Sequence, residues 1–284
     1  MEESGLEDML KDPVFRAMTQ SFSSKEVQGC IQTVDAIAGY KLSDEDREPF
    51  LYFHKYITDP QPDFITSWRQ EPKLEKWYHR FVNGFLMDVQ NALACVCYHH
   101  ERLCFIENTI LSEIEKHNYQ KALGNSTVGL GNTLVWDFEY QAFILAFRRC
   151  LDYLARAVCN YFKNDFHSFR RLGEYLQKLG KDEITNPIVV IHQKYKDDFE
   201  FVLSEGDRKS LRDKITHYEY VPVGTINLSS RGFMLAGGGE NLGFGEEGSP
   251  VLLSEAINNH LINIKACTHE MIHSLVDQLK AAGV

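Results

Sequence analysis

The strongest constraint on the fold is a long stretch of helical periodicity that runs from Lys73 to about Lys121. Apolar residues recur there at steps of three and four almost without interruption, and this spacing places them on one face of an α-helix. The stretch therefore predicts one long helix, or two helices separated by a break.

Most of the remaining sequence also indicates helices. Short periodic segments in residues 1–70 are interrupted by Ser, Asp and Pro, whereas a dense apolar run predicts a deeply packed helix from Trp136 to Phe162. Gly124 to Thr133 is the clearest linker, and Ser254 can cap a final amphipathic helix. Alternating apolar residues and many glycines between Val221 and Pro250 predict a strand pair or an ordered loop.

The predicted fold class is therefore all-α, with a short Gly-rich β/loop insertion near 221–250. We divide it into an N-terminal helical segment, 1–70, and a helical domain, 71–284. A hydrophobic content of 44% over 284 residues is enough for a sizeable core. The seven cysteines lie mostly in apolar helical patterns, which favours reduced thiols over disulfides.

The first residues, the lengths of the apolar runs and the net charge indicate the compartment and the partners to expect. The first residues, MEESGLEDML, are acidic and lack the order of a signal peptide, and no apolar run approaches the length of a membrane span. We therefore expect a cytoplasmic protein with no membrane partner. The net charge of −10 argues against non-specific coating of nucleic acid but leaves room for a local basic site.

Basic residues concentrate in two places. One group precedes the end of the predicted central helix and comprises Arg148, Arg149 and Arg156. The other lies around the stretch LRDKITHYEY and comprises Arg208, Lys209, Arg212 and Lys214, with Asp207 as the expected N-cap of a helix that begins at Arg208.

Two other patterns raise the possibility of a metal. In CVCYHHERLC, Cys95 and His99 are four apart, but one helix does not bring four zinc ligands together, so core thiols with marginal histidines are the favoured interpretation. HEMIH, from His269 to His273, matches the HExxH zinc pattern. Only eleven residues follow it, without a suitable third ligand, so we favour two histidines at the edge of a buried stripe and assign no metal and no cofactor.

Arg212, Asp213 and His217 carry the most specific chemistry. Arginine offers a planar fork of donors for phosphate, and histidine exchanges protons near neutral pH. Together they suit RNA cleavage by attack of the 2′-hydroxyl on phosphorus without a metal. On an ideal α-helix Arg212 and His217 lie about 140° apart, so a shared site favours two copies related by a two-fold axis.

Asp213 directly follows Arg212, and four residues lie between Arg212 and His217. This pattern fits the mark of the HEPN superfamily, which the chain resembles. The similarity covers about 125–284. It implies a dimerising helical bundle and, in many members, a metal-independent endoribonuclease that leaves a 2′,3′-cyclic phosphate, often in toxin–antitoxin or antiphage defence systems. Glu219 departs from one toxin subgroup, which has a tyrosine two places after the histidine.

The resemblance assigns roles to individual residues. Arg212 would bind the scissile phosphate, His217 would act as general base or acid, and Asp213 would orient groups in the cleft. RNA contacts are expected from the flanking basic residues Arg208, Lys209 and Lys214. A polar residue of the preceding helix can contribute as well, and the candidates are Glu139, Arg148 and Asp152.

Three functions follow from these patterns. The first is a homodimeric HEPN-type endoribonuclease that acts on RNA and is restrained by an antitoxin or another regulatory protein. The second is a non-catalytic HEPN module that binds nucleotide or RNA or scaffolds a partner. The third is a zinc hydrolase built on HEMIH.

Overall fold

The computed structural model describes residues 25–119, 127–130, 132–203, 209–223, 225–229, 232–236 and 252–283. It divides the chain into two compact units, Met1–Lys41 and Leu42–Val284. In the first unit the helix α3 (Lys25–Ala38) has no buried residue, and it exposes Ile31, Val34 and Ile37.

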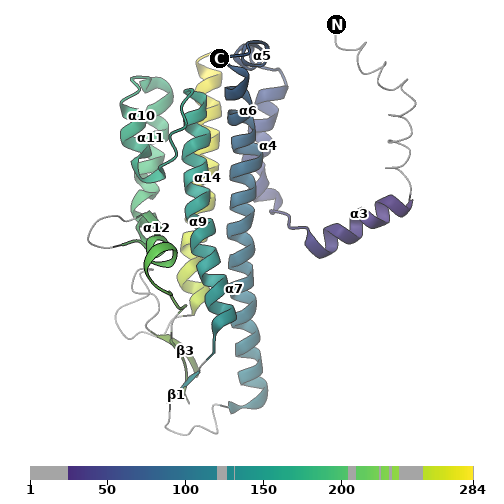
Figure 1. Ribbon diagram of the computed structural model, residues 1–284, viewed down its shortest axis with the longest axis vertical. Coiled ribbons are helices and arrows are strands. Elements are labelled where there is room, and N and C mark those ends of the chain that lie inside the picture. Colours follow the sequence, from purple (N-terminus) through teal and green to yellow (C-terminus); the bar gives the residue numbers. More distant parts are fainter. Residues whose placement is uncertain are drawn as a thin grey trace. The chain divides into compact units, whose positions relative to one another are not determined.

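The second unit is a bundle built on three long helices. These are α7 (Gln90–His117), α9 (Leu134–Tyr161) and α14 (Leu253–Ala281), and Figure 1 shows them running side by side. Of the shorter N-terminal helices, α4 (Asp44–Thr58) packs against α14, α6 (Glu75–Asn83) packs against α9, and α5 (Asp63–Gln70) packs against α6. The all-α fold class is thereby confirmed.

Shorter elements complete the bundle. α10 (Leu172–Gln177) and α11 (Asp182–Lys196) form a pair, and α11 packs against α14. α12 (Glu200–Leu203) leads toward the motif segment that begins with α13 (Leu211–Asp213).

The long periodic stretch forms a continuous helical rod in which the break is a change of helix type. A π-helical segment, Gly84–Val89, joins α6 to α7. At Gly84 this rod passes α9 closely, because a Cβ atom there would lie 3.2 Å from the Cβ of Ala157. Only glycine fits this approach without displacing a neighbour.

The predicted central helix is the most deeply buried element. Trp136, Tyr140, Phe143 and Phe147 of α9 are each at most 1% exposed, as expected from the dense apolar run. On α14 the predicted stripe is also confirmed, since Ile264, Met271 and Leu275 are fully buried.

The start of α14 differs from the prediction. Leu252, rather than Ser254, occupies the N-cap position, and the cap is supplied by another helix. The buried carboxylate of Glu107, on α7, accepts hydrogen bonds from the backbone N–H groups of Leu253 (2.6 Å) and Ser254 (3.1 Å). A carboxylate at this end also interacts favourably with the positive pole of the helix dipole.

The only strands in the described residues form one small antiparallel sheet in the order β1-β2-β3. The strands β2 (Thr225–Ser229) and β3 (Gly232–Ala236) are the strand pair expected near 221–250. β1 (Thr127–Leu130) pairs with β2 and comes from the stretch that the sequence marks as a linker. Its partner lies about 100 residues further along the chain, and local pattern carries no sign of such a pairing.

The first boundary of the predicted division differs from that of the compact units. α4 packs against α14 and therefore belongs with the second unit, although residues 1–70 form one segment in the sequence analysis. Local sequence indicates where a helix starts and stops, but it does not show which other helix it packs against. No helix in the described part of the chain is long and apolar enough to cross a membrane.

Candidate functional site

The motif segment is a short, irregular helix. α13 is a single turn, and a π-helical turn, Lys214–Tyr218, continues it. The Ser210 hydroxyl accepts from the backbone N–H of Asp213 and caps the start. The helix thus begins at Leu211 and not at Arg208, because Ser210 satisfies this end; Arg208 and Asp207 lie outside the described residues.

The π-helical turn changes the angle between the two motif residues. The backbone N–H of Glu219 donates to Lys214 O at 2.9 Å, an i to i+5 bond. In such a turn each residue is rotated by roughly 80–85° about the helix axis from the residue before it, which is less than in an α-helix. Arg212 and His217 therefore lie about 90° apart, in place of about 140° on an ideal α-helix. The two side chains nevertheless have different surroundings.

Arg212 enters a pocket, and His217 does not. The pocket has a volume of about 310 Å³, and its lining residues are Leu145, Arg148, Arg149, Asp152, Tyr153, Arg156, His167 and Arg212. His217 is exposed and is not among these residues; its ring lies edge-on to that of Tyr218. The sequence-predicted pair is thus not brought together within one chain.

This arginine pocket joins the two predicted sets of basic residues at one point. Arg148 and Arg149 are adjacent on α9, Arg156 lies about two turns further along the same helix, and Arg212 comes from the motif segment. Four guanidinium groups and the Asp152 carboxylate line this pocket, on a chain whose net charge is −10.

Carboxylates hold three of these arginines in place. Arg148 Nε donates to Asp152 Oδ2 at 2.8 Å, and Arg148 Nη1 donates to the carbonyl of Val202 at 2.9 Å. Arg156 donates to Asp88 at 3.2 Å. A guanidinium has five donors, so each paired arginine keeps donors for a further acceptor.

Arg212 itself donates to Asp213 Oδ1 at 2.5 Å. Burial acts to raise the pKa of Asp213, but hydrogen bonds from Arg212 and Ser210 and the charge of Arg148 outweigh it, so the pKa falls below its ordinary value. Asp213 is therefore ionised near neutral pH and fixes the direction of the Arg212 side chain.

The end of the motif segment is tied to α9. Asp137, only 4% exposed, accepts from the Tyr220 hydroxyl at 2.7 Å and from the backbone N–H of Val223 at 2.8 Å. Partial desolvation and the hydrogen bond to the Asp137 carboxylate raise the pKa of Tyr220 to about 12, so its hydroxyl stays protonated and can donate. Gln141 donates to the carbonyl of Val221 at 2.9 Å.

Other predicted contact residues lie elsewhere. Lys209 stands over the ring of Tyr218, 3.1 Å from its centroid, and Lys214 pairs with Glu219 at 3.4 Å. Neither lysine lines the arginine pocket. Glu139 bonds to His99 at 2.7 Å, so among the three candidates from α9 only Arg148 and Asp152 lie in the pocket.

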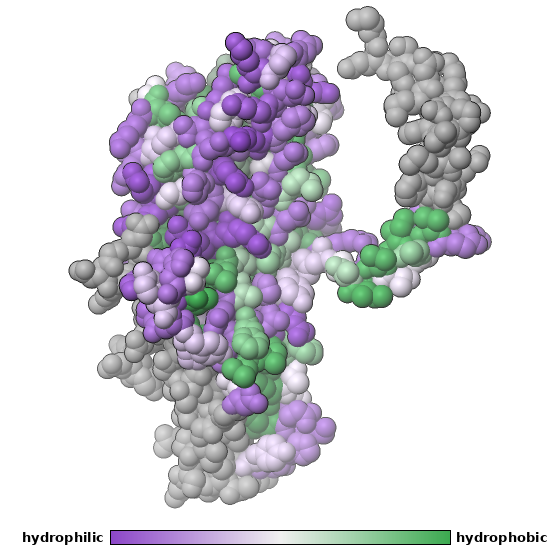
Figure 2. All heavy atoms as spheres, in the orientation of Figure 1, coloured by the Kyte–Doolittle hydropathy of each residue, from purple (hydrophilic) through white to green (hydrophobic). Residues whose placement is uncertain are grey.

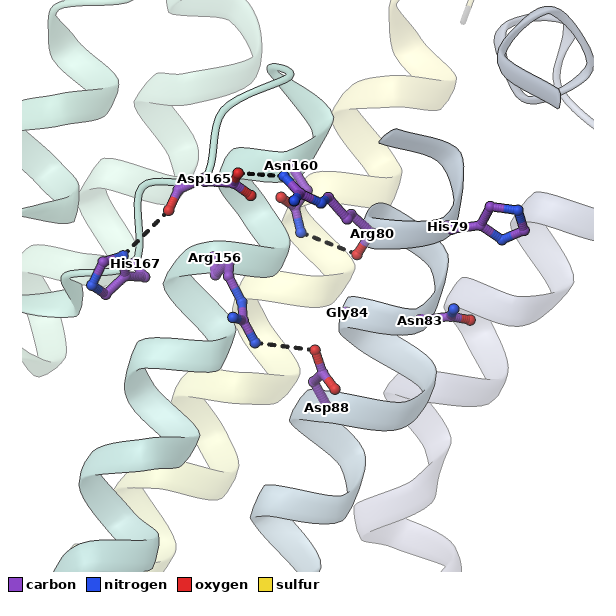
Figure 3. Close-up of a pocket in the computed structure, with 9 residues that line it drawn as sticks. All are labelled: His79, Arg80, Asn83, Gly84, Asp88, Arg156, Asn160, Asp165 and His167. Carbon is purple, nitrogen blue, oxygen red and sulfur yellow. Dashed lines mark hydrogen bonds and ion pairs between the residues drawn. The ribbon is translucent and has the colours of Figure 1, made fainter. Parts of the chain in front are cut away.

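His167 is the site residue that the sequence reasoning missed. It follows the end of α9 in a loop, and it lines both the arginine pocket and a neighbouring polar pocket of about 460 Å³. Figure 3 shows this second pocket, where Arg156 reaches Asp88 and His167 faces Asp165. A lone histidine in a loop has no spacing signal, and only the fold places it beside Arg156.

The HExxH histidines lie on another face of the bundle. His269 and His273 of α14 both approach Glu48 of α4.

Comparison with protein-family models, curated proteins and solved structures gives no match for the chain. The HEPN resemblance therefore rests on the motif residues and their sequence context.

Proposed function

We propose that the protein is a metal-independent endoribonuclease of the HEPN type, which binds an RNA phosphate in the arginine pocket. The observation that carries this proposal is the convergence of Arg212 with Arg148, Arg149 and Arg156 around one pocket of about 310 Å³. Arginine forks match phosphate oxygens, and a cluster of them stabilises the extra negative charge of a pentacoordinate phosphorus.

The proposed reaction needs a base and an acid. The 2′-oxygen attacks phosphorus as its proton passes to the base, and the bond to the 5′-oxygen breaks as the acid protonates that oxygen. The products are a 2′,3′-cyclic phosphate and a 5′-hydroxyl. His217 is assigned to one of these steps, and Arg212 holds the phosphate.

The proposal includes a homodimer, and the position of His217 supports it. Because His217 is outside the pocket of its own chain, a second copy is needed to supply it to Arg212. An apolar surface for such a contact exists at the beginning of α9, where Leu134, Val135 and Phe138 are 47–64% exposed. Figure 2 shows a hydrophobic patch in the lower half of this face of the bundle, while the upper half is mainly hydrophilic.

The same α9 face connects this apolar surface to the arginine pocket. Phe138, Leu145, Arg149, Asp152 and Arg156 follow one another at steps of seven, four, three and four, which is the spacing of a single helix face. Leu145, at the pocket margin, lies about two turns from Phe138 on this face, so a partner that packs along both turns covers the margin of the pocket.

A second candidate function is a non-catalytic module that binds RNA or nucleotide, with a regulatory protein or antitoxin as a further partner. Three arginines of the pocket are paired with carboxylates, which favours this candidate, because a structural ion-pair network gathers guanidinium groups without a catalytic role. This module would bind phosphate without cleaving it.

Labelled RNA incubated in EDTA separates the two candidates. We expect cleavage that ends in a cyclic phosphate, with a loss of about 10²- to 10⁴-fold for His217→Ala, as for removal of a general acid or base. Arg212→Ala should also abolish cleavage, whereas His117→Ala, which changes an exposed histidine paired with Glu113, serves as the control. Full cleavage by His217→Ala would refute the assignment, and RNA binding without cleavage in the wild type would favour the module.

Mixing two inactive variants tests the shared site. If Arg212 of one chain works with His217 of the other, random exchange of Arg212→Ala with His217→Ala chains restores about a quarter of wild-type activity, because half of the dimers carry one intact site. If both residues act from one chain, the mixture stays inactive. Loss of activity in His167→Ala together with retention in His217→Ala would instead assign the proton transfer to the pocket histidine.

A further inference from the structure

The HEMIH motif meets a carboxylate from a distant helix. Glu48 Oε2, on α4, lies 2.7 Å from Nε2 of His273 and 3.2 Å from Nε2 of His269. One ligand atom from each of these side chains lies within 4.8 Å of the others. Sequence reasoning sought a third ligand after the motif, whereas the fold provides it more than 200 residues earlier.

We propose that Glu48, His269 and His273 form a binding site for a divalent transition ion of the zinc class. Imidazole nitrogen and carboxylate oxygen are the donors that Zn²⁺ takes in sites with three protein ligands. No cysteine is part of this set, and no residue of the arginine pocket belongs to it.

The spacing fits a tetrahedral ion after a small adjustment. Bonds of about 2.0–2.2 Å place neighbouring ligand atoms roughly 3.3–3.5 Å apart, so the 2.7 Å contact of Glu48 with His273 must lengthen by about 0.6–0.8 Å and the 3.2 Å contact with His269 by about 0.1–0.3 Å. The side chains of His269 and Glu48 are 48% and 50% exposed, and that of His273 is 25% exposed. Water can therefore reach a fourth position.

Neighbouring groups hold the His273 ring in position. Tyr52 stacks on it with ring centroids 4.3 Å apart and planes 9° apart, and His269 stacks on it with centroids 4.3 Å apart. Tyr52 donates to Asp277 at 2.5 Å and accepts from the Lys280 ammonium at 2.8 Å. A fixed ring lowers the entropy that metal binding must overcome.

The glutamate of the motif is engaged elsewhere. Glu270 accepts from the Lys194 ammonium at 2.6 Å and from the Tyr195 hydroxyl at 2.7 Å. In HExxH hydrolases this glutamate acts as the general base beside the ion. Here the ion instead links α4 to α14, so its effect is on stability and not on hydrolysis.

Metal titration of the full chain, after treatment with EDTA and its removal, tests the site. We expect one Zn²⁺ or Co²⁺ ion per chain, and a rise in melting temperature when it binds. Glu48→Gln and His273→Gln should each weaken binding by at least about tenfold and remove the rise, because each takes away one of three ligands. His54→Gln, an exposed histidine on the same α4 helix, should change the affinity by less than about twofold.

Cobalt absorption and a folding control complete the test. Nitrogen and oxygen ligands give Co²⁺ visible bands without a thiolate charge-transfer band, whereas a strong thiolate band would place the ion at cysteines and overturn the proposal. Equal binding by Glu48→Gln, with circular dichroism matching the wild type, would overturn it as well. RNA cleavage in EDTA does not enter this outcome, so failure of either proposal is recognised separately.

Discussion

The capping of α14 by Glu107 gives the sharpest prediction for stability. Glu107→Ala removes the acceptor of two backbone N–H groups, those of Leu253 and Ser254, at a position where the Glu107 side chain is fully buried. The buried N–H of Leu253 left without a partner costs about 1–3 kcal/mol, the part-buried N–H of Ser254 costs less, and the lost charge–dipole interaction adds about 0.3–2 kcal/mol. Relief from burying a carboxylate offsets part of this, so we expect a net loss of about 3 kcal/mol.

Urea unfolding followed by far-ultraviolet circular dichroism measures this loss. For a chain of this size, about 3 kcal/mol corresponds to a fall of roughly 6–12 °C in melting temperature. Glu107→Gln keeps one carbonyl acceptor and should lose about half as much. Glu113→Ala, on the exposed face of the same helix, should stay within about 0.5 kcal/mol. A loss below about 1 kcal/mol for Glu107→Ala would show that water or another group caps α14.

Three further predictions concern reactivity, pH and assembly. Because a hydrogen bond from His99 lowers the pKa of the Cys95 thiol, iodoacetamide should alkylate Cys95 near neutral pH, and His99→Ala should slow this about threefold to tenfold by mass spectrometry. Burial acts to raise the pKa of Glu270, but its hydrogen-bond partners outweigh burial and lower this pKa overall. The ionised Glu270 therefore stabilises the fold above its unfolded-state pKa, and this stabilisation is lost as pH falls through the lower folded-state pKa. The melting temperatures of wild type and Glu270→Gln should accordingly converge in acid. Light scattering should show that Phe138→Asp weakens self-association by about tenfold or more, whereas Val190→Asp, at a position on α11 that is at least as exposed, leaves it unchanged. Unchanged association of Phe138→Asp would place the dimer contact elsewhere.

The helices that bury a regular face could be predicted from the sequence. In α9 and α14 the apolar residues that recur at steps of three and four are those the structure buries, since helical periodicity is a local property. The sequence predicts a start of the motif helix at Arg208, three residues before the observed start at Leu211. Asp207 and Ser210 are both residue types that cap helices, and the bond from the Asp213 N–H to the Ser210 hydroxyl identifies Ser210 as the cap.

The candidate sites could be predicted only in part. Sequence spacing finds residues that share one helix, such as His269 and His273, or that form a cluster, such as Arg148 and Arg149. It does not find the partner from another element, because His167 and Glu48 approach these residues only through helix packing. The same reason explains the α14 cap, whose two halves are 146 residues apart in the chain.

The separation of the two proposed sites determines how an effect of EDTA must be interpreted. A loss of RNA cleavage in EDTA has two possible origins, a metal in the reaction or a bundle that opens when its metal link between α4 and α14 is removed. Glu48→Gln distinguishes them, because Glu48 lies outside the arginine pocket and the substitution removes a metal ligand without changing Arg212 or His217. If Glu48→Gln cleaves RNA normally well below its melting temperature and EDTA has no effect on it, the link stabilises the fold and the chemistry belongs to the arginine pocket. If EDTA still abolishes cleavage by Glu48→Gln, a metal acts elsewhere in the reaction and the metal-independent mechanism is wrong.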